Sequence, residues 1–309
     1  MQVKKAFILV NIGSPSELSV GAAKSFLLQF LSDPEVISAP FFIRYPLAYR
    51  IASKRAEAYL ENLKKISING VPRLRATCSA LARKISSITA VDTFAAYRYG
   101  GDSIADTVRA ARSLGAREFR FVPMFPQSAS STTLSVKKEV FAHRREGERF
   151  LFKENYFEDA AYVSALANSF KKYGDRRLPV LASFHSIPVS QNSRTDYSGQ
   201  CSKTVEKFAS AAEISDVSLA WQSQMGGIVK WLLPSATETA EKMAKDGSYG
   251  INVICPGFAC DCTETLIEID GDLRKVFLGA GGKIFNYIPC LNDSADHAVM
   301  FSEIFERMK

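Results

Sequence analysis

The stretch from Ile251 to Ile269 constrains the fold more than any other part of the chain. Its first five residues are rich in Ile, Val and Cys and predict a buried β-strand. Pro256-Gly257 breaks this strand, and an apolar helical run begins after Asp261. A buried strand that turns sharply into a helix is typical of an open α/β sheet, in which ligands bind beyond the carboxyl ends of the strands. We therefore expect this junction to lie at a ligand-binding edge.

The acidic residues of this junction allow two interpretations. Asp261 stands three residues before Glu264, which is the spacing of a capping box with Asp261 as the N-cap. Alternatively, Asp261, Glu264 and Glu268 form one carboxylate face, because residues three and four apart align on a helix. Carboxylates grouped at a pocket can accept protons or bind a hard cation. The junction alone leaves both interpretations open.

Apolar strands alternate with helical segments along the whole chain of 309 residues. Each half contains about four predicted strands, and this alternation is typical of a parallel sheet covered by helices on both faces. The predicted strands lie at 5–11, 93–97, 119–125, 150–156, 178–184, 216–221, 251–255 and 283–288.

Composition and charge exclude several classes of protein. No run approaches the roughly 18 apolar residues of a membrane-spanning helix. The net charge of +7 is spread along the chain and favours anionic ligands or lipid, and no nucleic-acid-binding motif is present. Six cysteines are too few for a disulfide scaffold of this length. The start, MQVKKAFILVNIG, is interpreted as a strand and not as a signal peptide, so we expect a protein of the reducing cytosol.

Residues 39–51 combine aromatic and aliphatic side chains with Arg44 and Arg50. They form either a core segment with basic ends or an apolar lip whose arginines lie near lipid headgroups at a membrane surface. The second interpretation predicts a cytoplasmic protein that contacts the inner face of the membrane. A separate polar, basic helix is predicted over 53–65.

Of the three histidines, His185 has the most informative position. A lone histidine is more often structural, but His185 and Glu264 follow equivalent strand ends in neighbouring strand–helix units. A neutral imidazole and a carboxylate can exchange protons or hold a divalent metal. Two ligands are fewer than the roughly four of a structural metal site, so such binding would be transient. Cys260 and Cys262 form CxC rather than CxxC, which disfavours a zinc or iron–sulfur site and favours buried thiols.

Together these motifs resemble those of ferrochelatases, the enzymes that insert ferrous iron into a porphyrin. They run nearly from end to end in the same order, and the last pieces are most similar to the proteobacterial type. The motifs are LVNIGSP (9–15), LLQFLSDPEVI (27–37), RYG (98–100), PMFPQ (123–127), SFHSIP (183–188), CPGFACDCTETLIEI (255–269), VFLGAGGKIFNYIP (276–289) and LND (291–293).

The resemblance implies an α/β fold of the class II chelatase type, with two similar doubly wound lobes. Each lobe would contain a parallel sheet of roughly four strands flanked by helices. The N-terminal Rossmann-like lobe would span 1–157 and include segment 39–51, and the C-terminal Rossmann-like lobe would span 158–289. The last helix, within 290–309, would pack back on the first lobe.

The resemblance also implies roles for individual residues. His185 and Glu264 match the histidine and glutamate that face each other across the family's porphyrin cleft, where they would bind the metal and transfer protons. Asp261 would support Glu264, and Phe258 and Trp231 would form apolar walls. The remaining candidate substrate contacts are Tyr59, Ser130 and the basic residues Arg44, Arg50, Lys54 and Arg55. Ser130 belongs to a cluster of hydroxyl residues that could equally cap a helix.

The implied substrates are protoporphyrin IX and Fe²⁺, with no resident cofactor and no iron–sulfur cluster. Two departures from the family pattern lie near the site: Gln224 replaces the arginine of an SRxG motif over 223–226, and Ser186 replaces a glycine. Several alternatives therefore stay open. They are a haem- or porphyrin-binding paralogue with little activity, a coproporphyrin ferrochelatase, a cobalt chelatase for sirohydrochlorin, and a two-lobed binder of small molecules.

Overall fold

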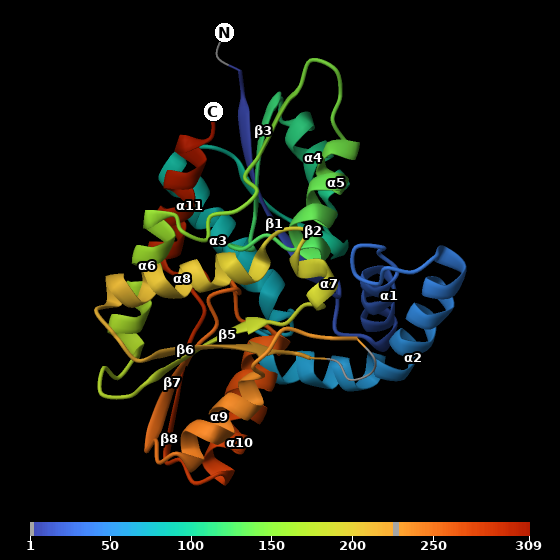
Figure 1. Cartoon of the computed structure of the whole chain (residues 1–309). Helices are drawn as coiled ribbons and strands as arrows, with labels where there is room; N and C mark the ends of the chain where they lie inside the picture. The colour runs from blue at the N-terminus through green and yellow to red at the C-terminus, as the bar shows by residue number, and fades with distance from the viewer. Residues whose placement is uncertain (1–2, 225–228) are drawn as a thin grey trace. The chain divides into compact units, whose positions relative to one another are not determined.

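Two four-stranded parallel sheets with the same strand order organise the protein, whose computed structural model describes residues 3–224 and 229–309 (Figure 1). The first sheet has the order β2-β1-β3-β4 and the second the order β6-β5-β7-β8. The chain divides into two compact units, one around each sheet. The predicted α/β fold with two doubly wound parallel sheets is thus confirmed.

Unit 1 comprises the described residues up to 125, residues 130–155 and residues 293–309. Its strands are β1 (Lys5–Ser14), β2 (Thr93–Gly100), β3 (Glu118–Pro123) and β4 (Arg149–Phe152). On one face of the sheet lie α3 (Arg73–Thr89) and α11 (Ala295–Arg307), and on the other α4 (Ile104–Ser113) and α5 (Ser135–Ala142). The π-helix η1 (Ser130–Leu134) runs directly into α5, and α1 (Val20–Leu31) packs against α2 (Phe41–Ile66) beside β2.

The alternation of side chains along β1 explains why both faces of this sheet are covered. Ile8 and Val10 belong to the core cluster formed with α4 and α5. Phe7 points to the opposite face, where its ring centroid lies 4.7 Å from that of Phe305 in α11. A strand whose successive residues are all apolar must bury both faces, and this is what the continuous run predicts.

Unit 2 comprises residues 126–129 and 156–292. Its strands are β5 (Val180–His185), β6 (Val217–Gln222), β7 (Gly250–Ile254) and β8 (Ile284–Ile288). The helices α6 (Ala160–Tyr173) and α8 (Tyr197–Ala212) pack together on one face. The other face carries α9 (Ala236–Lys245), the π-helix η2 (Glu264–Leu273) and α10 (Arg274–Gly279). The short helix α7 (Val189–Asn192) follows β5.

The predicted break between segment 39–51 and the helix over 53–65 is wrong, because both belong to the single helix α2. A stripe of small and apolar residues, Ala48, Ala52, Ala56, Leu60 and Leu63, is buried along one side of α2 and continues past the expected boundary. Helical spacing of that stripe outweighs the proline at position 46, which lies in the exposed first part of the helix.

The first turns of α2 do not form a core segment. Phe41, Phe42 and Ile43 are 65%, 75% and 52% exposed, and Leu47 and Tyr49 are also exposed. The interpretation of 39–51 as buried core is therefore wrong. None of the described helices is both long enough and apolar enough to cross a membrane.

Candidate active site

His185 is the last residue of β5 and the only exposed residue of that strand. Its ring nitrogen Nδ1 lies 2.6 Å from the carbonyl oxygen of Ser186. A carbonyl oxygen can only accept a hydrogen bond, so Nδ1 carries the proton and donates it. In the neutral imidazole this leaves the lone pair on Nε2, which can accept a proton or bind a metal ion.

Glu264 begins η2, and its side chain is half-buried. The Thr263 hydroxyl donates a hydrogen bond of 2.8 Å to Oε2 of Glu264. η2 extends over ten residues as a π-helix, a conformation that is rare and often found at functional sites. The sequence predicted a helix here but not its π form.

Asp261 does not cap this helix, so the capping-box interpretation is wrong. The residue before η2 is Thr263, which makes no side-chain capping hydrogen bond. Asp261 is 4% exposed, and its carboxylate accepts hydrogen bonds from the Tyr287 hydroxyl at 2.5 Å and the Asn292 amide at 2.7 Å. Thr265 and the Cys290 backbone also donate to it, at 3.2 and 3.3 Å. Asp261 thus ties the turn before η2 to the segment around the end of β8.

Glu268, one turn further along η2, is the third acidic residue of the predicted carboxylate face. The backbone N–H and the hydroxyl of Ser223 donate to its two oxygens at 2.6 and 2.7 Å. Burial raises the pKa of the Glu268 carboxyl, and the charge of Glu264 raises it further. The hydrogen bonds from Ser223 lower this pKa, as does His185 when its imidazole is charged. Glu268 therefore lies within electrostatic reach of both His185 and Glu264.

Gln222, the last residue of β6, connects the elements that carry the histidine and the glutamate. It is the register partner of His185 across the β5–β6 ladder. Its side-chain amide donates a hydrogen bond of 2.8 Å to the backbone carbonyl of Glu264. The structure thus brings His185 and the start of η2 to the same end of this sheet, as their positions after strand ends predicted.

Trp231 and Phe258 also belong to unit 2. The segment around Trp231 runs against the residues that follow His185: Trp231 forms an isolated bridge with Pro188, and the Leu232 N–H donates to the Ile187 carbonyl at 3.2 Å. The indole Nε1 of Trp231 is buried and has no hydrogen-bond acceptor among the described residues. Phe258 is partly buried against the core cluster of α9 and η2.

Gln224, at the position of the missing arginine, donates a hydrogen bond of 2.6 Å to the Leu232 carbonyl. Its amide is thus used to hold the segment that carries Trp231. Met225 and Gly226, the rest of this motif, lie outside the described residues.

The other substrate candidates belong to unit 1. Tyr59 in α2 is half-buried and stacks on Phe26 of α1, with ring centroids 5.9 Å apart. Arg50 is exposed, as are Lys54 and Arg55. Ser130 is 0% exposed, so a ligand at the surface would reach the half-buried hydroxyls of its neighbours in η1 before it reached Ser130.

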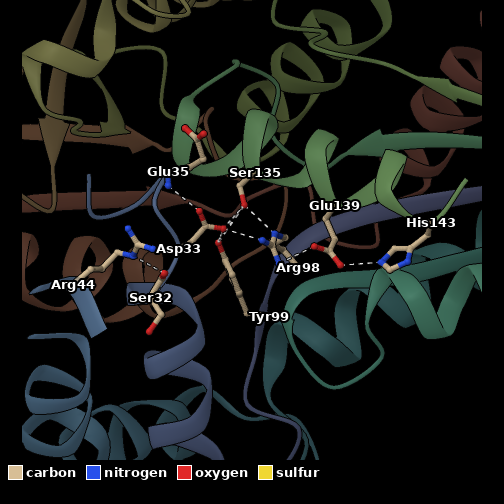
Figure 2. A network of polar contacts seen from close by, with 9 residues as sticks. All are labelled: Ser32, Asp33, Glu35, Arg44, Arg98, Tyr99, Ser135, Glu139 and His143. Atoms are coloured by element: carbon tan, nitrogen blue, oxygen red, sulfur yellow. Dashed lines mark hydrogen bonds and ion pairs between the residues drawn. The ribbon is translucent and has the colours of Figure 1, made fainter. Parts of the chain in front are cut away.

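A polar network around Asp33 fixes the chain where it leaves α1 (Figure 2). Oδ2 of Asp33 accepts hydrogen bonds from Arg98 at 2.9 Å and from Tyr99 and Ser135 at 2.7 Å. Burial alone would raise the pKa of the Asp33 carboxyl, but the hydrogen bonds from Tyr99, the Glu35 amide and Ser135, with the Arg98 charge, hold it below its usual value. Asp33 is therefore ionised at neutral pH.

Arg44 completes the attachment of the segment between α1 and α2. Its guanidinium donates to the Ser32 carbonyl at 2.7 Å (Figure 2). It also donates to the Ala39 carbonyl. These two bonds join the beginning and the end of the connecting segment. Arg44, a candidate for pairing with propionates, is thus engaged with backbone carbonyls, and Arg50, Lys54 and Arg55 remain exposed on the same helix.

Across residues 3–224 and 229–309, no three His, Cys, Asp or Glu side chains are grouped as ligands of a metal ion. All six cysteines are free thiols. Burial raises the pKa of the Cys255, Cys262 and Cys290 thiols, so these side chains stay protonated at neutral pH.

The fold is similar to those of two solved structures over nearly the whole chain. It is similar to the structure of SirB from Bacillus subtilis with Fe³⁺, with a TM-score of 0.57 and 14% identity over 98% of this chain and 95% of SirB. CbiX, the terminal enzyme of sirohaem biosynthesis in denitrifying bacteria, is similar with a TM-score of 0.52 over 99% of this chain and all of CbiX. Because both structures are only 14% identical to this chain, the similarity supports the fold and says nothing about the reaction.

Sequence similarity defines the family. A sequence profile named Ferrochelatase matches residues 4–309. The ferrochelatase of Azoarcus sp. (strain BH72) is 34% identical over 95% of this chain and 84% of its own length. That of Escherichia coli O127:H6 is 32% identical over 98% of both chains. The chain belongs to the ferrochelatase family, lyases that insert iron into a porphyrin in the last step of haem biosynthesis.

Proposed function

We propose that this chain inserts Fe²⁺ into protoporphyrin IX to give protohaem, with His185 and Glu264 as the pair that handles the metal and the protons. The observation that supports this most strongly is the hydrogen bond from Nδ1 of His185 to the Ser186 carbonyl. It leaves the basic Nε2 lone pair at the end of the sheet where Glu264 begins η2. Family membership supplies the reaction, and this local geometry supplies the candidate groups.

The chemistry requires a base and a ligand in the same place. Both inner pyrrole protons of the porphyrin must leave as the metal enters the ring. Nε2 of His185 can accept a proton, and the Glu264 carboxylate can bind Fe²⁺, for which imidazole and carboxylate are suitable ligands. The metal is a substrate and must leave with the product, so a small ligand set is appropriate. The raised pKa of Glu268 makes it suitable to take a proton onward, and Asp261 supports the turn before Glu264.

Substrate binding is assigned to apolar and basic side chains. Phe258 and Trp231 would contact the macrocycle in unit 2, and Tyr59 is the matching candidate in α2. Arg50, with Lys54 and Arg55, would pair with the propionates, because exposed guanidinium and ammonium groups bind carboxylates. Ser130 is the weakest candidate, since its hydroxyl is buried.

The test is metal insertion by the purified chain, followed anaerobically by the loss of porphyrin fluorescence with Fe²⁺ and by the product spectrum with Zn²⁺. We expect turnover with protoporphyrin IX, slower turnover with coproporphyrin III, and none with sirohydrochlorin and Co²⁺. Tight porphyrin binding without turnover would instead identify a haem-binding paralogue and point to Gln224 as the decisive replacement. Faster turnover with coproporphyrin III would contradict the assignment of protoporphyrin.

We further propose that the start of α2 contacts a membrane surface. Exposed apolar side chains predominate in its first nine residues, and exposed basic residues follow on the same helix, which is the composition of an interfacial helix. Replacing both Phe41 and Phe42 with Ser should lower the affinity for anionic phosphatidylglycerol vesicles, measured by cosedimentation, by at least about thirtyfold, because burying two aromatic rings contributes more than about 2 kcal/mol. The control is Ile88→Ser, which removes a side chain of 52% exposure from α3. Equal losses in both variants would refute a specific role for α2.

A further inference from the structure

The end of β6 carries two polar residues that were not predicted as site residues. Gln222 is 3% exposed, and Ser223 adopts a left-handed backbone with φ of 61°. We infer that Gln222 and Ser223 are positioning residues that hold η2, with Glu264 and Glu268, in place relative to His185 during metal insertion. This inference rests on the proposed function and concerns how its geometry is maintained.

The Gln222 side chain joins three elements at once. Its carbonyl oxygen accepts a hydrogen bond of 2.8 Å from the Ser183 hydroxyl in β5. Its amide nitrogen donates to the Glu264 carbonyl in η2 at 2.8 Å. Because the Glu264 carbonyl can only accept, the orientation of this amide is fixed. A buried amide with both ends satisfied cannot turn without breaking a bond, so it sets the separation of β5 and η2.

The Gln222 backbone adds a second connection to the histidine. Its carbonyl accepts a hydrogen bond of 2.8 Å from the Ser186 N–H. Ser186 is also the residue whose carbonyl fixes the Nδ1 proton of His185. One residue of β6 therefore bonds both to Ser186, the residue whose carbonyl orients the imidazole, and to the Glu264 carbonyl at the start of η2.

Ser223 fixes the next turn of η2 by a different means. A left-handed conformation is unfavourable for residues other than glycine, asparagine and aspartate, so its presence here requires compensation. In this conformation the N–H and the hydroxyl of Ser223 both point at the Glu268 carboxylate, at 2.6 and 2.7 Å. Each oxygen of Glu268 receives one of these bonds, so the carboxylate cannot rotate freely.

The first test is Gln222→Met, which keeps the length of the side chain and removes both hydrogen bonds. An error of about 1 Å at a reacting group can cost ~100-fold in rate, so we expect kcat to fall by about 10- to 100-fold. The KM for protoporphyrin IX should change by less than about twofold, because the macrocycle does not contact this buried amide. Gln222→Glu, which keeps the acceptor for Ser183 and loses the donor to Glu264, should be as slow as Gln222→Met.

The matched control is Asn286→Leu in β8. It removes a side-chain amide that bonds to the Tyr173 carbonyl at 2.9 Å and to Asn252 at 2.8 Å, in the same unit but away from η2. If simple destabilisation lowered the rate, this variant would lose activity as Gln222→Met does. Folding of each variant is checked by its far-UV circular dichroism spectrum and thermal midpoint. A wild-type rate in folded Gln222→Met, or an equal loss in Asn286→Leu, would overturn the assignment of Gln222.

Ser223 is tested by Ser223→Ala and Ser223→Gly. Both remove the hydroxyl, and only glycine also relieves the left-handed backbone. We expect kcat to fall about three- to tenfold in both variants, because losing one hydrogen bond to a carboxylate weakens the fixation of Glu268. Wild-type kcat in both would overturn the assignment of Ser223. A wild type that does not metallate porphyrin would refute the proposed function itself, whatever these variants do.

Discussion

Glu264→Gln and His185→Ala should each lower the rate of metal insertion into protoporphyrin IX by about 10³-fold. Glutamine has the shape of glutamate without its charge, so Glu264→Gln removes metal binding and proton transfer while keeping the side-chain volume. His185→Ala removes the Nε2 lone pair that the Ser186 contact leaves available. Loss of a general base or acid typically costs about 10²- to 10⁴-fold, and the loss of a metal ligand adds to this.

Two control variants separate chemistry from stability. Glu213→Gln removes a carboxylate that is 73% exposed at the end of α8 in the same unit. His143→Ala removes a histidine that contacts Glu139 in unit 1 at 2.9 Å. Both should keep the wild-type rate in the fluorescence assay. Active Glu264→Gln and His185→Ala would show that other groups carry the protons and the metal.

The double variant refines this prediction. If His185 and Glu264 act in one step, combining His185→Ala with Glu264→Gln should be little slower than either alone, because residues that act as a unit are not additive. Multiplication of the two losses would indicate separate steps. Porphyrin binding, measured by fluorescence titration, should stay near the wild-type value in all three variants, since apolar contacts dominate the affinity for a macrocycle.

The fold was predictable because the strands are rich in apolar residues and β1 is a continuous apolar run over Ala6–Val10. Every residue from Ala6 to Val10 is buried, and a run of that kind specifies a sheet covered on both faces. The end of α1 was also predictable from Asp33-Pro34. The hydrogen bonds of the Asp33 side chain were not predictable, because its partners Arg98, Tyr99 and Ser135 lie more than 60 residues away in sequence.

The errors have physical causes that a local pattern does not contain. The helix was predicted to begin at residue 53, after the aromatic segment, but the buried stripe on α2 packs against α1 and continues through that position. The Asp261–Glu264 spacing suggested a capping box, but Tyr287 and Asn292 compete for the Asp261 carboxylate and prevail. Tertiary hydrogen bonds of this kind outweigh local propensity.

The site was predicted in part, from the positions of His185 and Glu264 after strand ends. Gln222 and Ser223 also follow a predicted strand, and that position is the signal that could have identified them. Their role depends on the β5–β6 register and on the positive φ of Ser223, which a single sequence does not reveal. The π-helical form of η2 was likewise not predicted.

Arg120→Ala should destabilise unit 1 by about 3 to 5 kcal/mol, the usual cost of removing one partner from a buried ion pair. The Arg120 side chain in β3 is 8% exposed and lies 2.7 Å from Glu118, which is 7% exposed. Arg120 also donates to the Phe305 carbonyl at 2.6 Å, near the end of α11. Alanine would leave Glu118 buried with only Arg149, at 3.3 Å, as an ionic partner among the described residues.

The positions of the two tryptophans allow the unfolding of unit 2 to be followed separately from that of the whole chain. Trp221 and Trp231 are the only tryptophans of the chain, and both belong to unit 2. Urea unfolding followed by far-UV circular dichroism reports the helices of both units, whereas tryptophan fluorescence reports unit 2. Arg120→Ala should shift the circular dichroism transition to lower urea and separate it from the fluorescence transition. Coincident, unshifted transitions would contradict a role for Arg120 in holding α11.

The matched variant replaces both partners, with Glu118→Gln and Arg120→Met together. Replacing a buried ion pair with neutral side chains of similar volume costs far less than removing one partner, because no unpaired charge remains in the interior. We expect this double variant to lose less than about half of the stability that Arg120→Ala loses. The remaining loss would measure the hydrogen bond from Arg120 to the Phe305 carbonyl and the stacking of its guanidinium 4.9 Å from the Phe305 ring. If the double variant were as unstable as Arg120→Ala, attachment of α11 and not charge burial would dominate the contribution of Arg120.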